Sequence, residues 1–304
     1  MDPADAGRDL WSAARELLGA DVLPVRDDPS GETFLVAMAG DLGVLRLYVA
    51  DPHRAGVDLS LARLVRGLVP VPDVLDWRPP SADGLGAFVL TAMPAGTRLD
   101  RVLATADVDL QRVLGMSVGS VLARLSGIPF LAPGTFRGPE LALEMDSRPV
   151  DLEAWVGDRL RRPPLEEWPV DVRRGLAAAA AAGAHHLDGV DRTCLVHGAF
   201  DGRHLLADPE TGAVTGLLDW SRAHAGTPVT DLGTLLRDVG LGPFTDAVEA
   251  SFRAGAPPLP AFLRETAAAA DLFVLVELAT RDLDHPVVNE ARTSLRTIGA
   301  RARD

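Results

Sequence analysis

Three short motifs between residues 195 and 232 constrain this chain more than any other feature of its sequence. The first is Leu195-Val-His-Gly-Ala-Phe-Asp-Gly-Arg-His-Leu-Leu-Ala207, in which a polar loop separates two apolar segments. The second, Gly216-Leu-Leu-Asp219-Trp220, is an apolar run ending in an acidic and an aromatic residue, and the third is Gly226-Thr-Pro-Val-Thr-Asp231-Leu232. Short apolar runs bounded by glycine and polar residues predict strands and a hairpin. The polar loop between them is the first place to look for chemistry.

The chain before residue 93 is rich in predicted strands. Residues 33–39 and 43–50 are β-favouring runs, and residues 72–77 and 87–91 predict two further strands. Between these pairs, apolar residues recur at helical spacing from Leu59 to Leu68 and predict one helix. This part is therefore expected to be a small sheet with a single helix.

From residue 93 onward the pattern is mainly helical. Met93-Pro-Ala-Gly96 breaks the strand pattern, and we place a boundary there between a unit of residues 1–92 and a unit of residues 93–304. The predicted helices cover residues 113–125, 170–187, 232–239, 244–253 and 260–280, and the predicted strands cover 193–196, 205–207 and 214–218.

The three motifs resemble those of the aminoglycoside phosphotransferase and choline kinase-like family, which has a protein-kinase-like fold. Its members carry H-G-D-x-x-x-x-N between apolar segments, then an apolar run ending in Asp-Trp or Asp-Phe, then G-x-P-x-x-D-L. All three signals occur here in the same order, and the resemblance extends over roughly residues 20–285. It implies an α+β bilobal fold, with a small β-rich N-terminal lobe and a larger, mainly helical C-terminal lobe. A fifth N-lobe strand is implied by the resemblance alone.

The resemblance also implies where a nucleotide would bind, in the cleft between the lobes. Arg46 matches the basic residue that contacts phosphate, and Asp58 matches its acidic partner on the following helix. Thr91 and Met93 lie in the segment against which adenine would rest, and the segment Ser30–Thr33 would cover the nucleotide. ATP and Mg²⁺ are the expected cofactors if nucleotide binding is retained, and otherwise none.

The catalytic loop departs from the family pattern at two positions. In the family the loop Asp is the general base, and the loop Asn and the later Asp hold magnesium. Here the loop begins at His197, the base position is Ala199, and the Asn position is His204. Alanine has no group that accepts a proton, and histidine suits Mg²⁺ poorly. Asp219 survives as a candidate metal ligand, and Asp231 survives as the residue that would anchor the loop.

Two residues are candidates to replace the lost base. Asp201 lies two positions after Ala199 and would serve as a shifted base if it pointed into the site. His204 is the second candidate, either as a base or as a cation that contacts phosphate. The structural alternative is that Asp201-Gly202 is a turn whose carboxylate is solvated or caps the loop. Losing a positioned base costs about 10²–10⁴ in rate.

Composition excludes several other kinds of protein. The chain has no lysine, so all 30 of its Lys+Arg residues are arginine, which excludes a Walker A site and Schiff-base chemistry. A net charge of −13 argues against nucleic acid and suits a cationic small molecule or a basic peptide. A lone cysteine, Cys194, excludes an intrachain disulfide, and together with the lack of a secretory signal or membrane span it favours the cytoplasm.

Two functions from different classes follow from these observations. We prefer an inactive or repurposed member of the family, a pseudokinase that binds a small molecule or peptide in the interlobe cleft. The abundance of Ala, Arg, Gly, Pro and Val is typical of high-GC bacteria. This association suggests natural-product biosynthesis, with a partner enzyme, as one context. The alternative is an active ATP-dependent O-phosphotransferase that acts on an antibiotic, metabolite or peptide hydroxyl through a shifted base.

Overall fold

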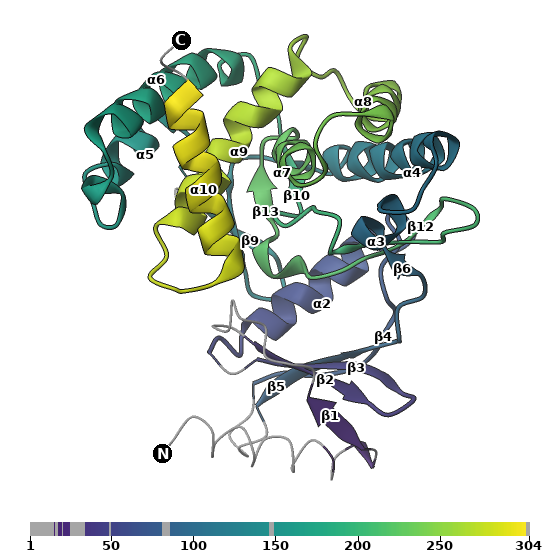
Figure 1. The fold of residues 1–304 in the computed structure, drawn as a ribbon. Helices are drawn as coiled ribbons and strands as arrows, with labels where there is room; N and C mark the ends of the chain where they lie inside the picture. Colours follow the sequence, from purple (N-terminus) through teal and green to yellow (C-terminus); the bar gives the residue numbers. More distant parts are fainter. Residues whose placement is uncertain are drawn as a thin grey trace.

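A five-stranded antiparallel sheet forms the N-terminal lobe of the computed structural model, which describes residues 15, 18–19, 21–24, 34–48, 50–80, 86–145 and 149–301. The strands run in the order β1-β2-β3-β5-β4, and one helix, α2 (Arg54–Val65), lies between the sheet and the rest of the molecule (Figure 1). Their bounds are β1 (Val22–Pro24), β2 (Phe34–Ala39), β3 (Gly43–Tyr48), β4 (Val74–Arg78) and β5 (Ala87–Thr91). The predicted β-rich lobe is thus confirmed. The segment Ser30–Thr33, expected to cover a nucleotide, lies outside the described residues.

Helices dominate the remainder of the chain, as the sequence predicts. Aspartates cap two of them: Asp107 accepts a hydrogen bond from the Leu110 amide at 2.8 Å, and Asp151 accepts one from the Ala154 amide at 2.8 Å. Within the described residues, no helix has both the length and the apolar character needed to cross a bilayer. The helices are α3 (Leu99–Leu103), α4 (Val108–Ser126), α5 (Leu152–Arg159), α6 (Val170–Leu187), α7 (Thr230–Val239), α8 (Pro243–Gly255), α9 (Leu263–Ala279) and α10 (Pro286–Arg301).

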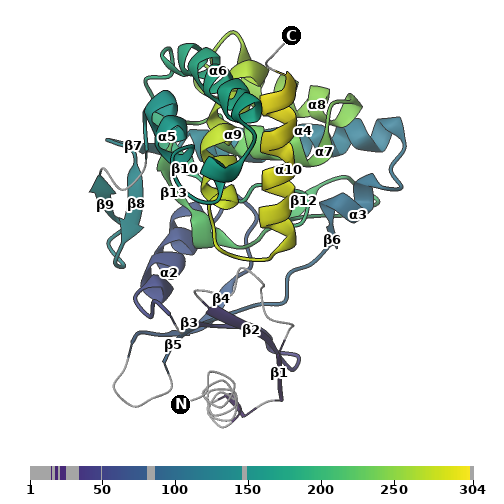
Figure 2. The same ribbon diagram turned by 60° about the vertical axis from the view of Figure 1, so that its left-hand side comes forward.

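Two small sheets lie within this helical lobe and position the loop that follows residue 196. One has the order β7-β10-β13-β8-β9, and the other has the order β12-β11-β6. The turn of the β8–β9 hairpin reaches α2 (Figure 2), where the Ser60 hydroxyl donates a hydrogen bond to the Pro139 carbonyl at 2.7 Å. The strands are β6 (Thr97–Arg98), β7 (Pro129–Phe130), β8 (Gly134–Arg137), β9 (Ala142–Met145), β10 (Thr193–Val196), β11 (Leu205–Ala207), β12 (Val214–Leu217) and β13 (His224–Gly226).

The sheet containing β10 was only partly predicted. The sequence gives a clear signal for β10 and for the β11–β12 hairpin. It gives none for β7, β8, β9 or β13, because strands of two to four residues carry too little periodicity. The register pairs Val196 with His224 and Cys194 with Gly226. The second and third sequence motifs are thereby brought beside the first.

Helices α6 and α10 cross in direct backbone contact. A Cβ built on Gly175 would lie 1.9 Å from the carbonyl oxygen of Gly299, far inside van der Waals contact. Gly175→Ala should therefore force the two helices apart and lower the free energy of unfolding by about 1–3 kcal/mol, despite the better helix propensity of alanine. Urea unfolding followed by circular dichroism measures this change.

Gly157 in α5 provides the matched control for this prediction. A Cβ there would meet only the Arg161 Nη1 atom at 3.7 Å, which is an ordinary contact. Gly157→Ala should leave stability unchanged or raise it by up to about 1 kcal/mol, because alanine favours the helix. Equal effects of the two substitutions would contradict the described contact between α6 and α10.

Candidate active site

The loop after β10 is fixed to helix α7 by one buried carboxylate. Asp231, in the first turn of α7, is 3% exposed and accepts hydrogen bonds from the amides of His197 at 2.7 Å and Gly198 at 2.9 Å. Gly198 has a φ of +79°, and a Cβ there would lie 2.4 Å from the Arg222 carbonyl oxygen, so only glycine fits. The anchoring role expected of Asp231 is consistent with these contacts.

His197 lies at the start of the loop and is fully buried. Its Nε2 atom donates a hydrogen bond to the Leu218 carbonyl at 3.0 Å, and its ring packs edge-on against Trp220 with the centroids 4.9 Å apart. Burial lowers the pKa of His197 to about 4, so the ring is neutral at physiological pH. His197 thus has no exposed surface, and a catalytic role for it stays a prediction.

Asp201, His204 and Asp219 form a chain of contacts at the front of the loop. An oxygen of Asp201 lies 2.9 Å from Nδ1 of His204, and Nε2 of His204 lies 3.8 Å from an oxygen of Asp219. Burial disfavours the charged ring of His204, but Asp201 and Asp219 outweigh it and raise the pKa of His204 above its ordinary value. The two carboxylates therefore favour the protonated form of the imidazole.

Asp201 is not free to act as a base. Its side chain is buried, it accepts a hydrogen bond from the Arg203 amide at 2.9 Å, and it pairs with the Arg203 guanidinium at 2.7 Å. Burial alone would raise the pKa of Asp201, but His204 and Arg203 hold the pKa of the carboxyl far below its usual range. A carboxylate that is so strongly stabilised accepts protons weakly. Of the two structural alternatives considered for Asp201, capping of the loop is confirmed and a solvated carboxylate is wrong.

Asp219 also faces cations from both lobes. Arg46, on β3, places a guanidinium nitrogen 3.5 Å from Asp219, while His204 approaches from the loop. Burial opposes ionisation of Asp219, but Arg46 and His204 prevail and lower its pKa to about 2. Asp219 itself has a φ of +61°, an uncommon conformation for a residue other than glycine that often marks functional sites.

Helix α2 supplies the second carboxylate of this charge network, that of Asp58. Asp58 accepts a hydrogen bond from the Tyr48 hydroxyl at 2.6 Å and pairs with Arg46 at 3.3 Å and Arg54 at 2.8 Å. Arg54 in turn donates to the Trp220 carbonyl at 2.6 Å, so the network crosses from one lobe to the other. The expected proximity of Arg46 and Asp58 is therefore present.

Sequence reasoning missed two members of this network, although signals for both exist. Arg54 precedes Asp58 by four residues, the spacing at which side chains meet on a helix. Tyr48 follows Arg46 by two residues on a strand, which places both side chains on one face of the sheet. The pairing of Arg222 with Glu277 at 3.1 Å was also missed, and no sequence spacing could have indicated it.

The donor set around Asp219 does not fit a magnesium ion. Mg²⁺ requires oxygen ligands, and the position that would complete the site is the imidazole of His204. One Asp219 oxygen lies 3.5 Å from a guanidinium nitrogen of Arg46, and the other lies 3.8 Å from Nε2 of His204. Among the residues that the structure describes, no three His, Cys, Asp or Glu side chains are grouped so as to hold a metal. The positively charged groups beside Asp219 are therefore side chains of the protein.

The remaining expected positions are Ala199 in the loop, Thr91 at the end of β5, and Met93 just after it. Ala199 is half-buried, and its carbonyl accepts the Asp201 amide at 3.0 Å, so the backbone turns tightly at the lost base. Thr91 ends β5 and donates a hydrogen bond from its hydroxyl to the Val44 carbonyl at 3.4 Å. Met93 follows it and is 46% exposed. A nucleotide-binding role for Thr91 and Met93 stays a prediction.

The loop anchor predicts a loss of stability that depends on pH. Asp231→Asn removes one of the two carboxylate acceptors, and should lower the free energy of unfolding by about 1.5–3 kcal/mol. Burial raises the pKa of Asp231 from 3.8 to about 6, against the opposing effect of the two amides. Because its pKa is higher in the folded state, Asp231 contributes its full stabilisation below pH 3.8. This contribution is lost as the pH rises through about 6. The penalty of Asp231→Asn should therefore be larger at acidic than at neutral pH.

Urea unfolding at pH 5 and pH 7.5 measures this difference. Asp109→Asn is the matched control, since that side chain is exposed and pairs only with Arg112 at the surface. The control should show a small change at both pH values. A penalty for Asp231→Asn that grows toward pH 7.5 would contradict the assignment.

Comparison with known proteins agrees with this geometry. The model of the phosphotransferase enzyme family, APH, matches residues 30–266. The GDP and kanamycin complex of APH(2")-IIia is similar in structure, with a TM-score of 0.70, 20% identity, and coverage of 92% of this chain and 93% of that chain. A thermostable mutant of APH(4)-Ia with ADP and hygromycin B gives a TM-score of 0.65 at 18% identity, with 96% of each chain covered.

A third similar structure is aminoglycoside phosphotransferase APH(3'')-Id from Streptomyces rimosus. It has a TM-score of 0.59 and 21% identity, and the match covers 90% of this chain and 99% of that one. At these identities the structural similarity establishes the kinase-like fold. Because the family model spans well over half of the sequence, this chain belongs to the phosphotransferase enzyme family.

Proposed function

We propose that this chain binds a ligand in its interlobe cleft without efficient phosphoryl transfer, as an inactive or repurposed member of its family. One observation carries the proposal: Asp219 is neutralised by Arg46 and His204, where phosphoryl transfer would need a metal ion. Transfer relies on charge neutralisation at the phosphates and on a positioned base. Here the base position is Ala199, and the nearest carboxylate in sequence, Asp201, is already paired.

The relatives support a nucleotide and a polar small molecule as the ligand classes. Kanamycin with GDP, and hygromycin B with ADP, are the pairs bound in two of the similar structures. The second of these proteins holds both ligands although one of its aspartates is replaced by alanine, so loss of a carboxylate is compatible with binding there. The net charge of −13 favours a cationic partner such as these aminoglycosides. A peptide or natural-product intermediate, presented by a partner enzyme, is the other ligand class we propose.

Two measurements on the wild-type chain test this function. Increasing ATP should raise the melting temperature, since a ligand that binds only the folded state stabilises it. With ATP, Mg²⁺ and either kanamycin or hygromycin B, ADP release should stay at the background of ATP alone. An acceptor-dependent turnover of about 1 s⁻¹, within the usual range of kinases, would overturn the proposal.

A second candidate function rests on the contact between Asp201 and His204. An Asp201 oxygen lies 2.9 Å from Nδ1 of His204, and Nε2 on the other side of the ring lies 3.8 Å from Asp219. Such a pair is the arrangement that positions a histidine base in other enzymes. In an active O-phosphotransferase, the shifted base would therefore be His204, with Asp201 as the residue that orients it.

Substitutions separate the two functions. If His204 is the base, His204→Ala should remove a measurable turnover entirely, while Asp201→Asn should reduce it partly and leave the affinity for ATP unchanged. If the chain is inactive, neither substitution has a turnover to remove. Full activity retained in His204→Ala would exclude the second candidate.

A further inference from the structure

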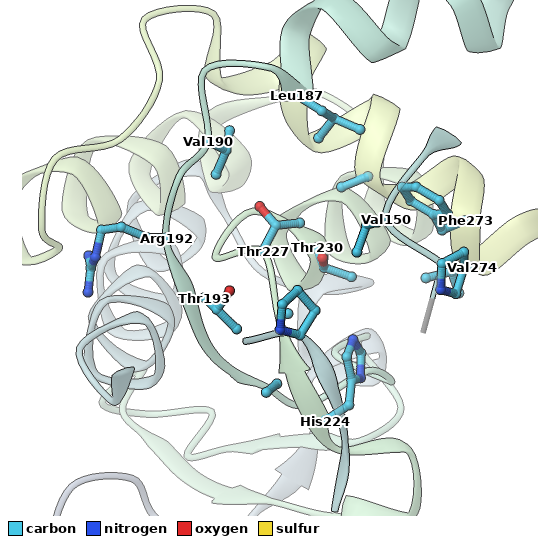
Figure 3. A pocket seen from close by; sticks show the side chains of 15 residues that line it. Val150, Leu187, Val190, Arg192, Thr193, His224, Thr227, Thr230, Phe273 and Val274 are labelled. Atoms are coloured by element: carbon cyan, nitrogen blue, oxygen red, sulfur yellow. The ribbon is translucent and has the colours of Figure 1, made fainter. Parts of the chain in front are cut away.

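A separate cavity lies in the helical lobe, between the β10–β13 pair and helix α9. Its volume is about 170 Å³. Figure 3 shows Thr227 and Thr230 in the middle of the lining residues, with His224 below them and Phe273 and Val274 to their right. None of its lining residues belongs to the loop 197–206 or to Asp219, so the cavity is independent of the cleft described above.

The walls of this cavity are largely apolar. They include proline, valine, leucine, alanine and phenylalanine side chains from five segments of the chain, which disfavour a highly charged ligand. The apolar lining residues are Pro133, Pro149, Val150, Leu187, Val190, Ala225, Ala270, Phe273 and Val274. Among the lining residues that the structure describes there is no aspartate or glutamate, and the one arginine, Arg192, extends away from the other labelled side chains (Figure 3).

Two polar groups of lining residues lack a hydrogen-bond partner within the described structure, Nη1 of Arg192 and the hydroxyl of Thr227. The Thr227 hydroxyl is a buried side-chain oxygen with no hydrogen bond, although buried hydroxyls are normally paired. Figure 3 shows Thr227 among the side chains that line the cavity, just after β13. Leaving such a group unpaired destabilises the protein, and a ligand with a hydroxyl or carbonyl would remove this penalty.

We infer that this cavity binds a neutral, single-ring compound carrying one hydroxyl or carbonyl group, which pairs with Thr227. The volume supports this size, because an engineered apolar cavity of about 150 Å³ in another protein binds benzene. Because no carboxylate lines the described part of the cavity, this ligand differs from the polycationic aminoglycosides. The unpaired Thr227 hydroxyl sets the orientation of the ligand.

Phenol and benzene are a matched pair of probes for this site. Both fit the volume, but only phenol can pair with the Thr227 hydroxyl. Isothermal titration of the full chain should show phenol binding about five- to tenfold more tightly than benzene. Thr227→Val, which keeps the shape and removes the hydroxyl, should abolish that preference, and Thr227→Ser should retain it.

Blocking the cavity gives an independent test. Val190 is half-buried at the rim, and Val190→Trp should fill the space and weaken phenol binding at least tenfold. Val170→Trp, at a site that is 61% exposed in α6, is the control and should leave binding unchanged. No binding of either probe at 10 mM, or equal binding to wild type and Thr227→Val, would overturn the inference. If Val190→Trp does not fold, the comparison of Thr227→Val with Thr227→Ser still tests the inference.

Discussion

Ala199→Asp combined with His204→Asn is expected to raise Mg²⁺-dependent ATP turnover by about 10²-fold or more over the wild-type chain. The first change restores a carboxylate at the base position, which is worth about 10²–10⁴ in rate. The second replaces the cation beside Asp219, 3.8 Å away, by a neutral amide whose oxygen suits Mg²⁺. ADP release with ATP, Mg²⁺ and an aminoglycoside acceptor measures the gain.

The matched control replaces Ala199 by asparagine in the same His204→Asn background. Asparagine has the shape of aspartate but accepts no proton at neutral pH, so this variant should stay near the wild-type rate. Equal rates in the two double variants would show that the gain does not come from a base. A wild-type rate already as high as that of the repaired chain would contradict the proposed loss of chemistry.

Asp58→Ala is expected to destabilise the chain by about 3–5 kcal/mol, the usual cost of removing one partner of a buried ion pair. Asp58 is 8% exposed and is the shared acceptor of Tyr48, Arg46 and Arg54. Its loss leaves these three donors clustered without the carboxylate that holds them. Urea unfolding measures the change.

Asp58→Asn serves as the graded control, because it keeps the size of the side chain and one acceptor oxygen while removing the charge. Its penalty should lie between wild type and alanine. If Asp58→Ala lowers the free energy of unfolding by less than about 1 kcal/mol, the ion pairs of Asp58 are as weak as those at a protein surface. That result would contradict its role in joining the lobes.

The sequence predicts the long elements of this fold well and the short ones poorly. Helix α6 and strands β5 and β10 have the predicted bounds, since each has a clear apolar pattern. Helix α10 was not predicted, although Val288, Ala291 and Leu295 recur at helical spacing and are buried. Strand β1 needed the family resemblance because it has only three residues.

The sequence predicts which residues lie near one another along the loop and hairpin, but not which side chains contact each other. Motif spacing alone places Ala199 and His204 in the loop and Asp219 at the end of the following hairpin. Whether Asp201 faces solvent depends on Arg203 and His204 folding back onto it, which no residue spacing reveals. The same limit applies to the charge balance at Asp219, because Arg46 reaches it from the other lobe.

The central claim is that internal cations take the place of the metal in this cleft. The most direct test is the affinity of the wild-type chain for ATP with and without Mg²⁺, measured by isothermal titration. Because Arg46 and His204 already neutralise Asp219, Mg²⁺ should change the Kd for ATP by less than about twofold. Binding at least about tenfold tighter with Mg²⁺, a difference of about 1.4 kcal/mol, would contradict the claim.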